Sequence, residues 1–268
     1  MQIVVTELRT YPCKGFRGVS SPVAEVTPCG FANDRRWMVV DANGKFVTQR
    51  NINAMALIRA TVHGADLLLA TDGAPDLAVA AGASRPEVTV AVWGHQVQAV
   101  DCGDGAANWL QARLGRPCRL VYMADPTARA VDPAYGGLPG DHVGFADGLP
   151  ILLTSMASLA DLNARMTVGI SMHRFRPNIV VDGELPWAED DWQEITIGGR
   201  SFRANGNCPR CAVSTIDQMT GVRSPDNEPI RALGGFRRDA TGQMLFGRYL
   251  TPLDGGIIRV GDALSVIR

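Results

Sequence analysis

Short runs of β-branched or alternating apolar residues, separated by turn-forming residues, dominate this sequence of 268 residues. Asp41-Ala42-Asn43-Gly44 separates two of these runs and is typical of a hairpin turn. In the first hundred residues, the runs predicted to form strands are Met1–Leu8, Trp37–Val40, Lys45–Thr48, Leu57–Val62 and Val88–Ala99.

Further strand-like runs follow in the second half of the chain, and only two segments have a helical pattern. Gly105–Leu114 is expected to be a helix that stops at Gly115. A second helix is expected at Ser158, where Asp161 completes the pattern of a capping box. Its apolar face is predicted to carry Leu159, Leu162 and Met166. The predicted strands here are Leu149–Thr154, Ile179–Val181, Glu194–Ile197, Ala212–Ile216 and Ile257–Val260, the last ended by Gly261-Asp262. Many short strands with few helices predict a β-rich α+β fold: an antiparallel or mixed barrel with helices packed outside.

The composition narrows the class of protein. A hydrophobic content of 46% is enough for a substantial core, and a net charge of −1 gives no reason to expect nucleic-acid binding. The N-terminus lacks a basic stretch followed by an apolar one, and no run is long enough to cross a bilayer. Cys13, Cys29, Cys102 and Cys118 are too scattered for a secreted disulfide scaffold. We therefore expect a cytoplasmic protein without a membrane segment.

The most reactive combination of residues in the chain is Cys208-Pro209-Arg210-Cys211. A guanidinium group beside two thiols favours a thiolate, the form that attacks electrophiles or binds soft metals. Two buried structural thiols, a dithiol redox centre and half of a zinc site all remain possible interpretations. Zinc is disfavoured because no second Cys-x-x-Cys exists, and a redox centre because a strand-like run follows the motif.

Several basic residues stand beside glycine turns or directly before predicted strands. Most arginines are solvated surface residues, but in these places they are well positioned to hold a phosphate through bidentate contacts. The residues concerned are Lys14 and Arg17 beside Gly15 and Gly18, Arg35 and Arg36 before Trp37, and Arg174 and Arg176 before Ile179.

Taken together, these segments resemble the MOSC family, named after the C-terminal domain of molybdenum cofactor sulfurases. Residues 11–15 and 33–40 resemble the N-terminal β-barrel that precedes a MOSC domain. The resemblance to the MOSC domain itself lies in residues 145–150, 158–163, 174–181, 208–211 with Thr215 and Asp217, and 246–249. Within the family, the pattern is most similar to amidoxime-reducing components and hydroxylaminopurine reductases. The resemblance implies a β-barrel domain over residues 1–124 and a cofactor-binding MOSC domain over 125–268, with 125–141 as a linker or lid.

The resemblance also implies a pyranopterin molybdenum cofactor, and no pyridoxal phosphate. Cys211 would be the protein ligand of molybdenum and would take part in catalysis. Gly15 and Pro209 depart from the family pattern, since serine is usual at both positions, and they put the substrate range in doubt. The cofactor would contact Lys14, Gly15, Arg35, Ser155, Arg176, Asn178, Pro209, Arg210 and Tyr249.

The implied reaction is reduction of N-hydroxylated compounds, such as amidoximes, hydroxylamines or hydroxylaminopurines. Because the six cysteines offer no iron–sulfur ligand set, electrons would come from a separate ferredoxin- or flavoprotein-type donor. Two alternatives use the same fold: a sulfur carrier with a persulfide on Cys208 or Cys211, and a non-catalytic module that binds the cofactor.

Overall fold

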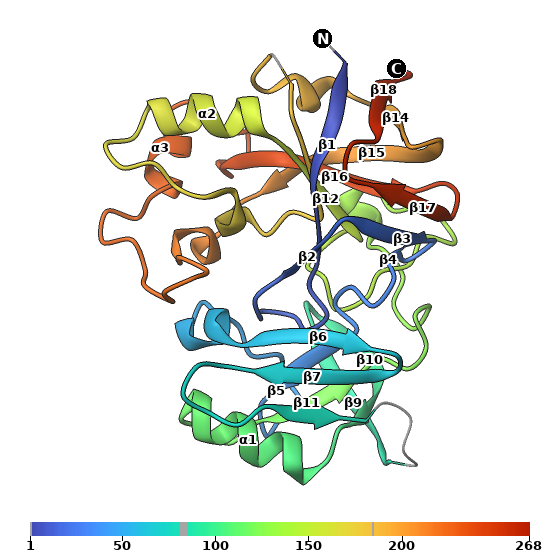
Figure 1. Cartoon of the computed structure of the whole chain (residues 1–268), viewed down its shortest axis with the longest axis vertical. Coiled ribbons are helices and arrows are strands. Elements are labelled where there is room, and N and C mark those ends of the chain that lie inside the picture. The colour runs from blue at the N-terminus through green and yellow to red at the C-terminus, as the bar shows by residue number, and fades with distance from the viewer. Residues whose placement is uncertain (1, 81–84, 184) are drawn as a thin grey trace.

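The computed structural model describes residues 2–80, 85–183 and 185–268 and is built of two lobes, with both chain ends in the upper one (Figure 1). The chain is rich in strands and only 17% helical. This architecture confirms the predicted β-rich fold.

The upper lobe is a closed barrel of seven strands in the order β13-β12-β16-β15-β14-β18-β1, closed by pairing of β13 with β1. Strands β12 and β13 are parallel and the other barrel pairs are antiparallel, so the barrel is mixed, as predicted. Its interior is filled by aliphatic side chains such as Ile151, Ile179 and Ile195, which are fully buried. The strands are β1 (Ile3–Thr10), β12 (Ile151–Ser155), β13 (Ile179–Val181), β14 (Glu194–Ile197), β15 (Arg200–Pro209), β16 (Leu245–Pro252) and β18 (Ala263–Val266), with β2 (Val19–Ser21) added beside β1.

The lower lobe is a half-barrel of two sheets with one helix, α1 (Asp104–Leu114), packed against them (Figure 1). Trp37, Leu67, Leu110 and Leu120 belong to the apolar core between these elements. One sheet contains β5 (Trp37–Val40), β11 (Arg119–Tyr122), β10 (His95–Asp101) and β9 (Glu87–Val92), and the other β6 (Arg59–His63), β7 (Asp66–Ala70) and β8 (Leu77–Val79).

The first thirty residues contribute strands to the upper lobe. Strand β1 pairs with β13 and β18, and β3 (Val23–Thr27) pairs with β4 (Gly30–Phe31) and with β17 (Gly256–Arg259). Strands therefore pair across the expected boundary between residues 124 and 125, and the division into two domains stays a proposal. The expected linker, residues 125–141, carries a 3-10 turn at Pro133–Tyr135 and the buried side chain of Arg129.

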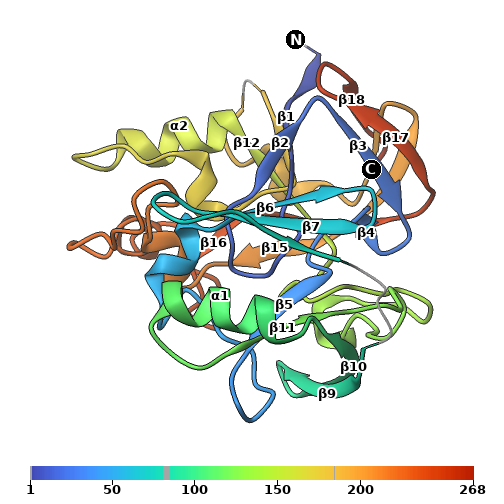
Figure 2. The same ribbon diagram turned by 60° about the horizontal axis from the view of Figure 1, so that its bottom comes forward.

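Two helices, α2 (Met156–Ala164) and α3 (Ile230–Gly234), lie on one side of the barrel (Figure 1), and Figure 2 shows α2 on that side in a second view. Leu159, Leu162 and Leu233 pack there with Phe175 and Phe246, and Met166 is partly buried against the same cluster. The predicted apolar face of α2 is thus confirmed. The remaining helical turns are of the 3-10 type, at Asn53–Leu57, Met172–Phe175, Ala188–Asp191 and Ala212–Thr215.

Several local predictions were wrong. Residues 88–99 form two strands of a hairpin, β9 and β10, with Trp93-Gly94 as the turn. Lys45 and Phe46 make only isolated bridges, and β6 begins at Arg59 after a 3-10 turn. Met1, at the start of the first predicted strand, lies outside the described residues. Strands β2, β3, β4, β7, β8, β11, β15 and β16 had not been predicted. Trp37–Val40, Ile179–Val181 and Glu194–Ile197 are strands as predicted, and the Asp41–Gly44 turn is present.

The predicted cap of α2 was also wrong. The helix begins three residues earlier, and its N-cap is Ser155, whose Oγ accepts a hydrogen bond from the Ala157 N–H. Ser158 is instead buried and donates its hydroxyl to Glu189, while accepting from the Trp187 N–H. A serine in a cap-like pattern can equally serve a tertiary hydrogen bond, which the sequence spacing does not reveal.

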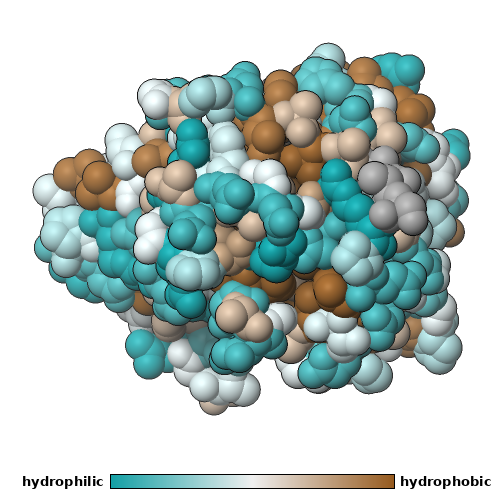
Figure 3. All heavy atoms as spheres, turned by 90° about the horizontal axis from the view of Figure 1, so that it is seen from below, coloured by the Kyte–Doolittle hydropathy of each residue, from teal (hydrophilic) through white to brown (hydrophobic). Residues whose placement is uncertain are grey.

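The surface at the end of the molecule seen from below mixes hydrophilic residues with separate groups of hydrophobic ones (Figure 3). Among the described residues, every helix is too short or too polar to span a bilayer. All six cysteines are free thiols.

Candidate functional site

A pocket lies between the two lobes and encloses about 870 Å³ of space, part of it open to solvent. Its walls come from segments far apart in the chain: the loop after β1, residues 47–50, residues 146–152, the turn before β13, and the end of β15. The structure brings together nine of the ten predicted site residues here, namely Lys14, Gly15, Arg35, Arg176, Asn178, Pro209, Arg210, Cys211 and Tyr249.

Ser155 is the exception. It lies at the far end of β12 from the pocket-lining Leu152, is buried, and caps α2. The structure therefore gives Ser155 a structural role in the helix start and does not bring it to the pocket.

The two cysteines of the motif have different surroundings. Cys208 is buried near the end of β15, and Arg210 Nη1 donates a hydrogen bond of 2.8 Å to its Sγ. Burial raises the pKa of the Cys208 thiol, although Arg210 and Tyr249 act in the opposite direction. Cys211 lies beyond the strand and is half-buried, and its carbonyl accepts hydrogen bonds from Ser214. Of the two, Cys211 is the more accessible thiol on the pocket wall.

The segment after Cys211 was predicted to be a strand and is a 3-10 turn, Ala212–Thr215, with Cys211 as its N-cap. The β-branched residues in it suggested a strand, but Ser214 and Thr215 hydrogen-bond back to nearby carbonyls, which stabilises a turn. This turn bends the chain away from the barrel directly after Cys211.

The protein supplies few metal ligands at this pocket. Across the three described ranges, no group of three or more His, Cys, Asp or Glu side chains could hold a metal ion, so the zinc interpretation has no ligand set there. A soft metal at Cys211 would need its remaining ligands from a non-protein group. A pterin dithiolene is a group of that kind, and the donor set fits it.

Arg35 and Arg176 both approach the buried ring of Tyr11, with their guanidinium carbons 4.2 and 4.4 Å from the ring centre. Both have positive φ, 47° and 57°. Asn178 Oδ1 accepts a hydrogen bond of 3.0 Å from Arg35 and one from the Leu152 N–H. These contacts hold the two arginines in place before any ligand arrives.

The pocket is short of negative charge. Arg176 donates to the Phe16 carbonyl and to Gln218 Oε1, and Arg210 to Cys208 and the Phe175 carbonyl. Neither guanidinium has an ion pair with a carboxylate of the described residues, and Arg210 Nε is buried without a partner. Burial lowers the pKa of Arg176 to about 10. Partly buried cations without anions are costly, so this pocket is prepared for an anionic ligand, and a cofactor phosphate fits it.

Lys14 is already paired. Its buried ammonium donates to the Phe145 carbonyl at 2.7 Å and forms an ion pair with Asp147, which also accepts from Trp93 Nε1 at 2.9 Å. Burial lowers the pKa of Lys14, and Asp147 counteracts that shift. The charge and hydrogen bond of Lys14 hold the pKa of the exposed Asp147 carboxyl well below its usual range, so the carboxyl stays ionised.

Both departures from the family pattern have a local structural explanation or consequence. Gly15 has φ of 84°, and a Cβ at this position would lie 2.8 Å from Met55 Cε, so serine would be strained here. Pro209 ends β15 opposite Leu245 and has no N–H to donate to the pocket.

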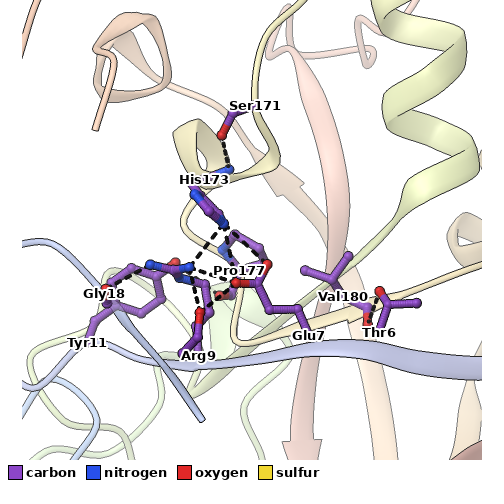
Figure 4. Close-up of polar contacts among 10 residues, drawn as sticks. Thr6, Glu7, Arg9, Tyr11, Gly18, Ser171, His173, Pro177 and Val180 are labelled. Carbon is purple, nitrogen blue, oxygen red and sulfur yellow. Dashed lines mark hydrogen bonds and ion pairs between the residues drawn. The ribbon is translucent and has the colours of Figure 1, made fainter. Parts of the chain in front are cut away.

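A partly buried polar cluster fixes the turn that carries Arg176 and Asn178 (Figure 4). Arg9 donates to Glu7, Ser20 and the Gly18 carbonyl, and its Nη1 lies 3.0 Å from His173 Nε2. Tyr11 donates its hydroxyl to the Pro177 carbonyl at 3.1 Å. The cluster therefore ties the turn before β13 to β1.

The sequence analysis did not select several residues of the pocket and its rim, among them Asp147, Trp93, Gln49 and Arg50. Asp147 stood inside the 145–150 motif, and an acidic residue between apolar ones was a usable signal. Trp93 was hidden in a predicted strand, although the glycine after it signals a turn. Gln49 and Arg50 follow a segment predicted to be a strand and carried no signal of their own.

Comparison with known proteins agrees with this arrangement. Residues 2–117 match the model of the MOSC N-terminal beta barrel domain, and residues 140–265 match that of the MOSC domain. The chain is 34% identical to mitochondrial amidoxime-reducing component 1 of Mus musculus over 98% of this chain and 82% of that protein, with the same figures for the Homo sapiens protein.

More distant matches exist. A molybdenum cofactor sulfurase of Drosophila grimshawi is 29% identical over 98% of this chain and 34% of its own length. The crystal structure of the YUAD protein from Bacillus subtilis aligns at a TM-score of 0.44 and 11% identity, covering 98% of this chain and 94% of that one. On the two domain matches and the full-length similarity to amidoxime-reducing components, this chain belongs to the MOSC-domain family.

Proposed function

We propose that this protein is a molybdenum cofactor-dependent reductase of N-hydroxylated compounds. For an amidoxime, the reaction takes up two electrons and two protons, breaks the N–O bond, and yields the amidine and water. The observation that carries the proposal is one pocket that combines the accessible thiol of Cys211 with two guanidinium groups, Arg176 and Arg210, that have no carboxylate partner among the described residues.

Different residues of the pocket would hold different parts of the cofactor. Cys211 would provide the thiolate to the metal, while Arg176 and Arg210 would neutralise its phosphate, and Arg35 and Asn178 would orient it. When bound, the cofactor supplies the two-electron redox chemistry. Pro209 and Tyr249 line the wall beside it.

Two side chains of the pocket, Lys14 and Tyr249, carry protons that they can donate in hydrogen bonds. Lys14 holds its proton at Nζ between the Phe145 carbonyl and Asp147. Burial raises the pKa of Tyr249 well above its ordinary value, so its hydroxyl remains protonated at neutral pH. Tyr249 and Lys14 are therefore two groups of this pocket that can donate hydrogen bonds to a substrate oxygen.

Electrons would come from a separate protein of the ferredoxin or flavoprotein type. The relatives are named as mitochondrial proteins, and the expected cytoplasmic location of this chain stays a prediction.

The experiment is turnover by protein produced in a host that makes the cofactor. With molybdenum bound, a chemically reduced dye should support reduction of an amidoxime, whereas NADH alone should not. Turnover with NADH alone would disprove the need for a separate donor. Failure with the dye, on metal-loaded protein and a broad panel of N-hydroxylated compounds, would disprove the reductase. A persulfide on Cys208 or Cys211, detected by mass spectrometry in such protein, would identify a sulfur carrier instead.

A further inference from the structure

Trp93 occupies an unusual position for a large aromatic residue. It is the first residue of the two-residue turn between β9 and β10, where Val92 pairs with His95, and both turn residues have positive φ, 50° for Trp93 and 85° for Gly94. Asn-Gly and Asp-Gly are the usual sequences of such a turn. A bulky residue held in this backbone conformation is strained, and strain of this kind concentrates at functional sites.

The side chain of Trp93 is fixed at the mouth of the pocket. Its Nε1 donates to Asp147 Oδ1 at 2.9 Å, and Asp147 is itself paired with the pocket residue Lys14. The ring lies 5.0 Å from Phe46, centre to centre, and Trp93 remains 43% exposed. The indole is therefore held in one orientation while much of it still faces solvent.

Arg50 connects this ring to the interior of the pocket. Its guanidinium carbon lies 4.8 Å from the centre of the Trp93 ring, and the residue lines the pocket wall. In the described part of the chain, no carboxylate forms an ion pair with Arg50. A guanidinium group is planar, and with one face backed by an indole it can stack its other face on a flat conjugated group.

We propose that Arg50, backed by Trp93, is a stacking shelf that makes the enzyme prefer N-hydroxylated substrates with a flat conjugated ring. This inference rests on the proposed function and adds a specificity-determining pair to it. The reacting N–O group would point inward toward Cys211, and the ring attached to it would lie on Arg50 at the mouth. A substrate without a ring would gain nothing from the shelf.

The test compares benzamidoxime with acetamidoxime, which share the reacting group and differ in the ring. The ratio of their kcat/KM values, measured with a reduced dye on metal-loaded protein, isolates the contribution of the ring. Arg50→Lys keeps the charge and removes the planar surface, and Trp93→Ala removes the backing. Each of these two substitutions should lower the ratio of kcat/KM for benzamidoxime to kcat/KM for acetamidoxime on the order of tenfold. A loss of this size lies within the range expected when one aromatic stacking contact is removed. Trp93→Phe keeps an aromatic backing and should retain most of the ratio.

A purely structural role predicts a different result. If Trp93 only holds Asp147 and Lys14 in place, Trp93→Ala and Trp93→Phe should lower kcat/KM equally for both substrates. A constant ratio of the two kcat/KM values would overturn the shelf.

Binding measured without any electron donor separates this inference from the proposed reaction. Calorimetry on the oxidised protein should show tighter binding of benzamidoxime than of acetamidoxime, and a loss of that difference in Arg50→Lys. Such a pattern in a protein that never turns over would support the shelf and disprove the reductase. Equal binding of the two compounds by the unmodified protein would overturn the shelf.

Discussion

Gln49 and Gln218 form a double amide hydrogen bond across the boundary between the lobes: Gln49 Nε2 donates to Gln218 Oε1 at 3.0 Å, and Gln218 Nε2 donates to Gln49 Oε1 at 2.9 Å. Both side chains are almost fully buried, at 1% and 5% exposure. Gln49 also donates to the Gly15 carbonyl, and Gln218 Oε1 accepts from Arg176. The pair thus links the loop after β1, the segment after Cys211 and the anion-binding arginine.

Breaking this pair on one side should destabilise the protein. Gln49→Leu or Gln218→Leu leaves a buried amide without its partner, and we expect each to lower the free energy of unfolding by about 1–3 kcal/mol in urea titrations. The double variant should lose less free energy of unfolding than the two single variants together, because it leaves neither glutamine amide without its partner. Additive losses in the double variant would show that the two residues act independently.

The two cysteines of the motif should respond differently to substitution. Cys211→Ala should abolish molybdenum binding and activity. Cys208→Ala should keep the metal, because the Cys208 thiol is buried and accepts a hydrogen bond from Arg210. Molybdenum and pterin content per chain, measured for both variants and the unmodified protein, checks this. Equal metal loss in the two variants would indicate a site that needs both thiols.

Arg176 should hold the anionic end of the cofactor. A charge-assisted hydrogen bond to a phosphate contributes roughly 1.5–3 kcal/mol, so Arg176→Ala should weaken cofactor retention about 10- to 100-fold. Pterin fluorescence released during dialysis measures retention. Arg165→Ala is the matched control, because this exposed arginine pairs with Asp161 on α2, away from the pocket. A fully loaded Arg176→Ala protein would contradict this placement.

Glu7 should make stability depend on pH in the acid range. Partial burial by itself would raise the pKa of Glu7, but contacts with His173, Ser20 and Arg9 outweigh it and lower the pKa to about 2. Ionised Glu7 therefore stabilises the fold above pH 4.5, and this contribution disappears as the pH falls toward 2. Its size is at most about 3 kcal/mol, reduced by solvent screening.

Unfolding of Glu7→Gln at several pH values tests this. The variant should be less stable than the unmodified protein at pH 7, and the difference should shrink between pH 4.5 and pH 2. Glu87→Gln, at an exposed position on β9, serves as the control. A difference that is constant from pH 7 to pH 3 would mean that the charge of Glu7 is not what stabilises the cluster.

The sequence by itself determined the fold class and most of the pocket. Trp37–Val40 and Ile179–Val181 are short, wholly apolar strands that can only be buried, so their runs predicted them directly. The basic residues beside glycine turns were well placed to hold an anion. The cysteine motif left structural thiols, a redox dithiol and a metal ligand open, and the resemblance to the MOSC family implied a soft metal there. The resemblance to the MOSC family extended these to ten site residues, and nine of the ten line one pocket.

Only the tertiary structure decided how distant segments meet. Closure of the barrel by β1 and β13 joins residues more than 170 positions apart, and no local pattern specifies that partner. Ser155 and Ser158 exchanged roles because a hydroxyl can cap a helix or serve a distant carboxylate equally well. The neighbours of a residue, and with them the Gln49–Gln218 pair and the contacts of Trp93 with Asp147 and Arg50, are properties of packing that sequence periodicity does not contain.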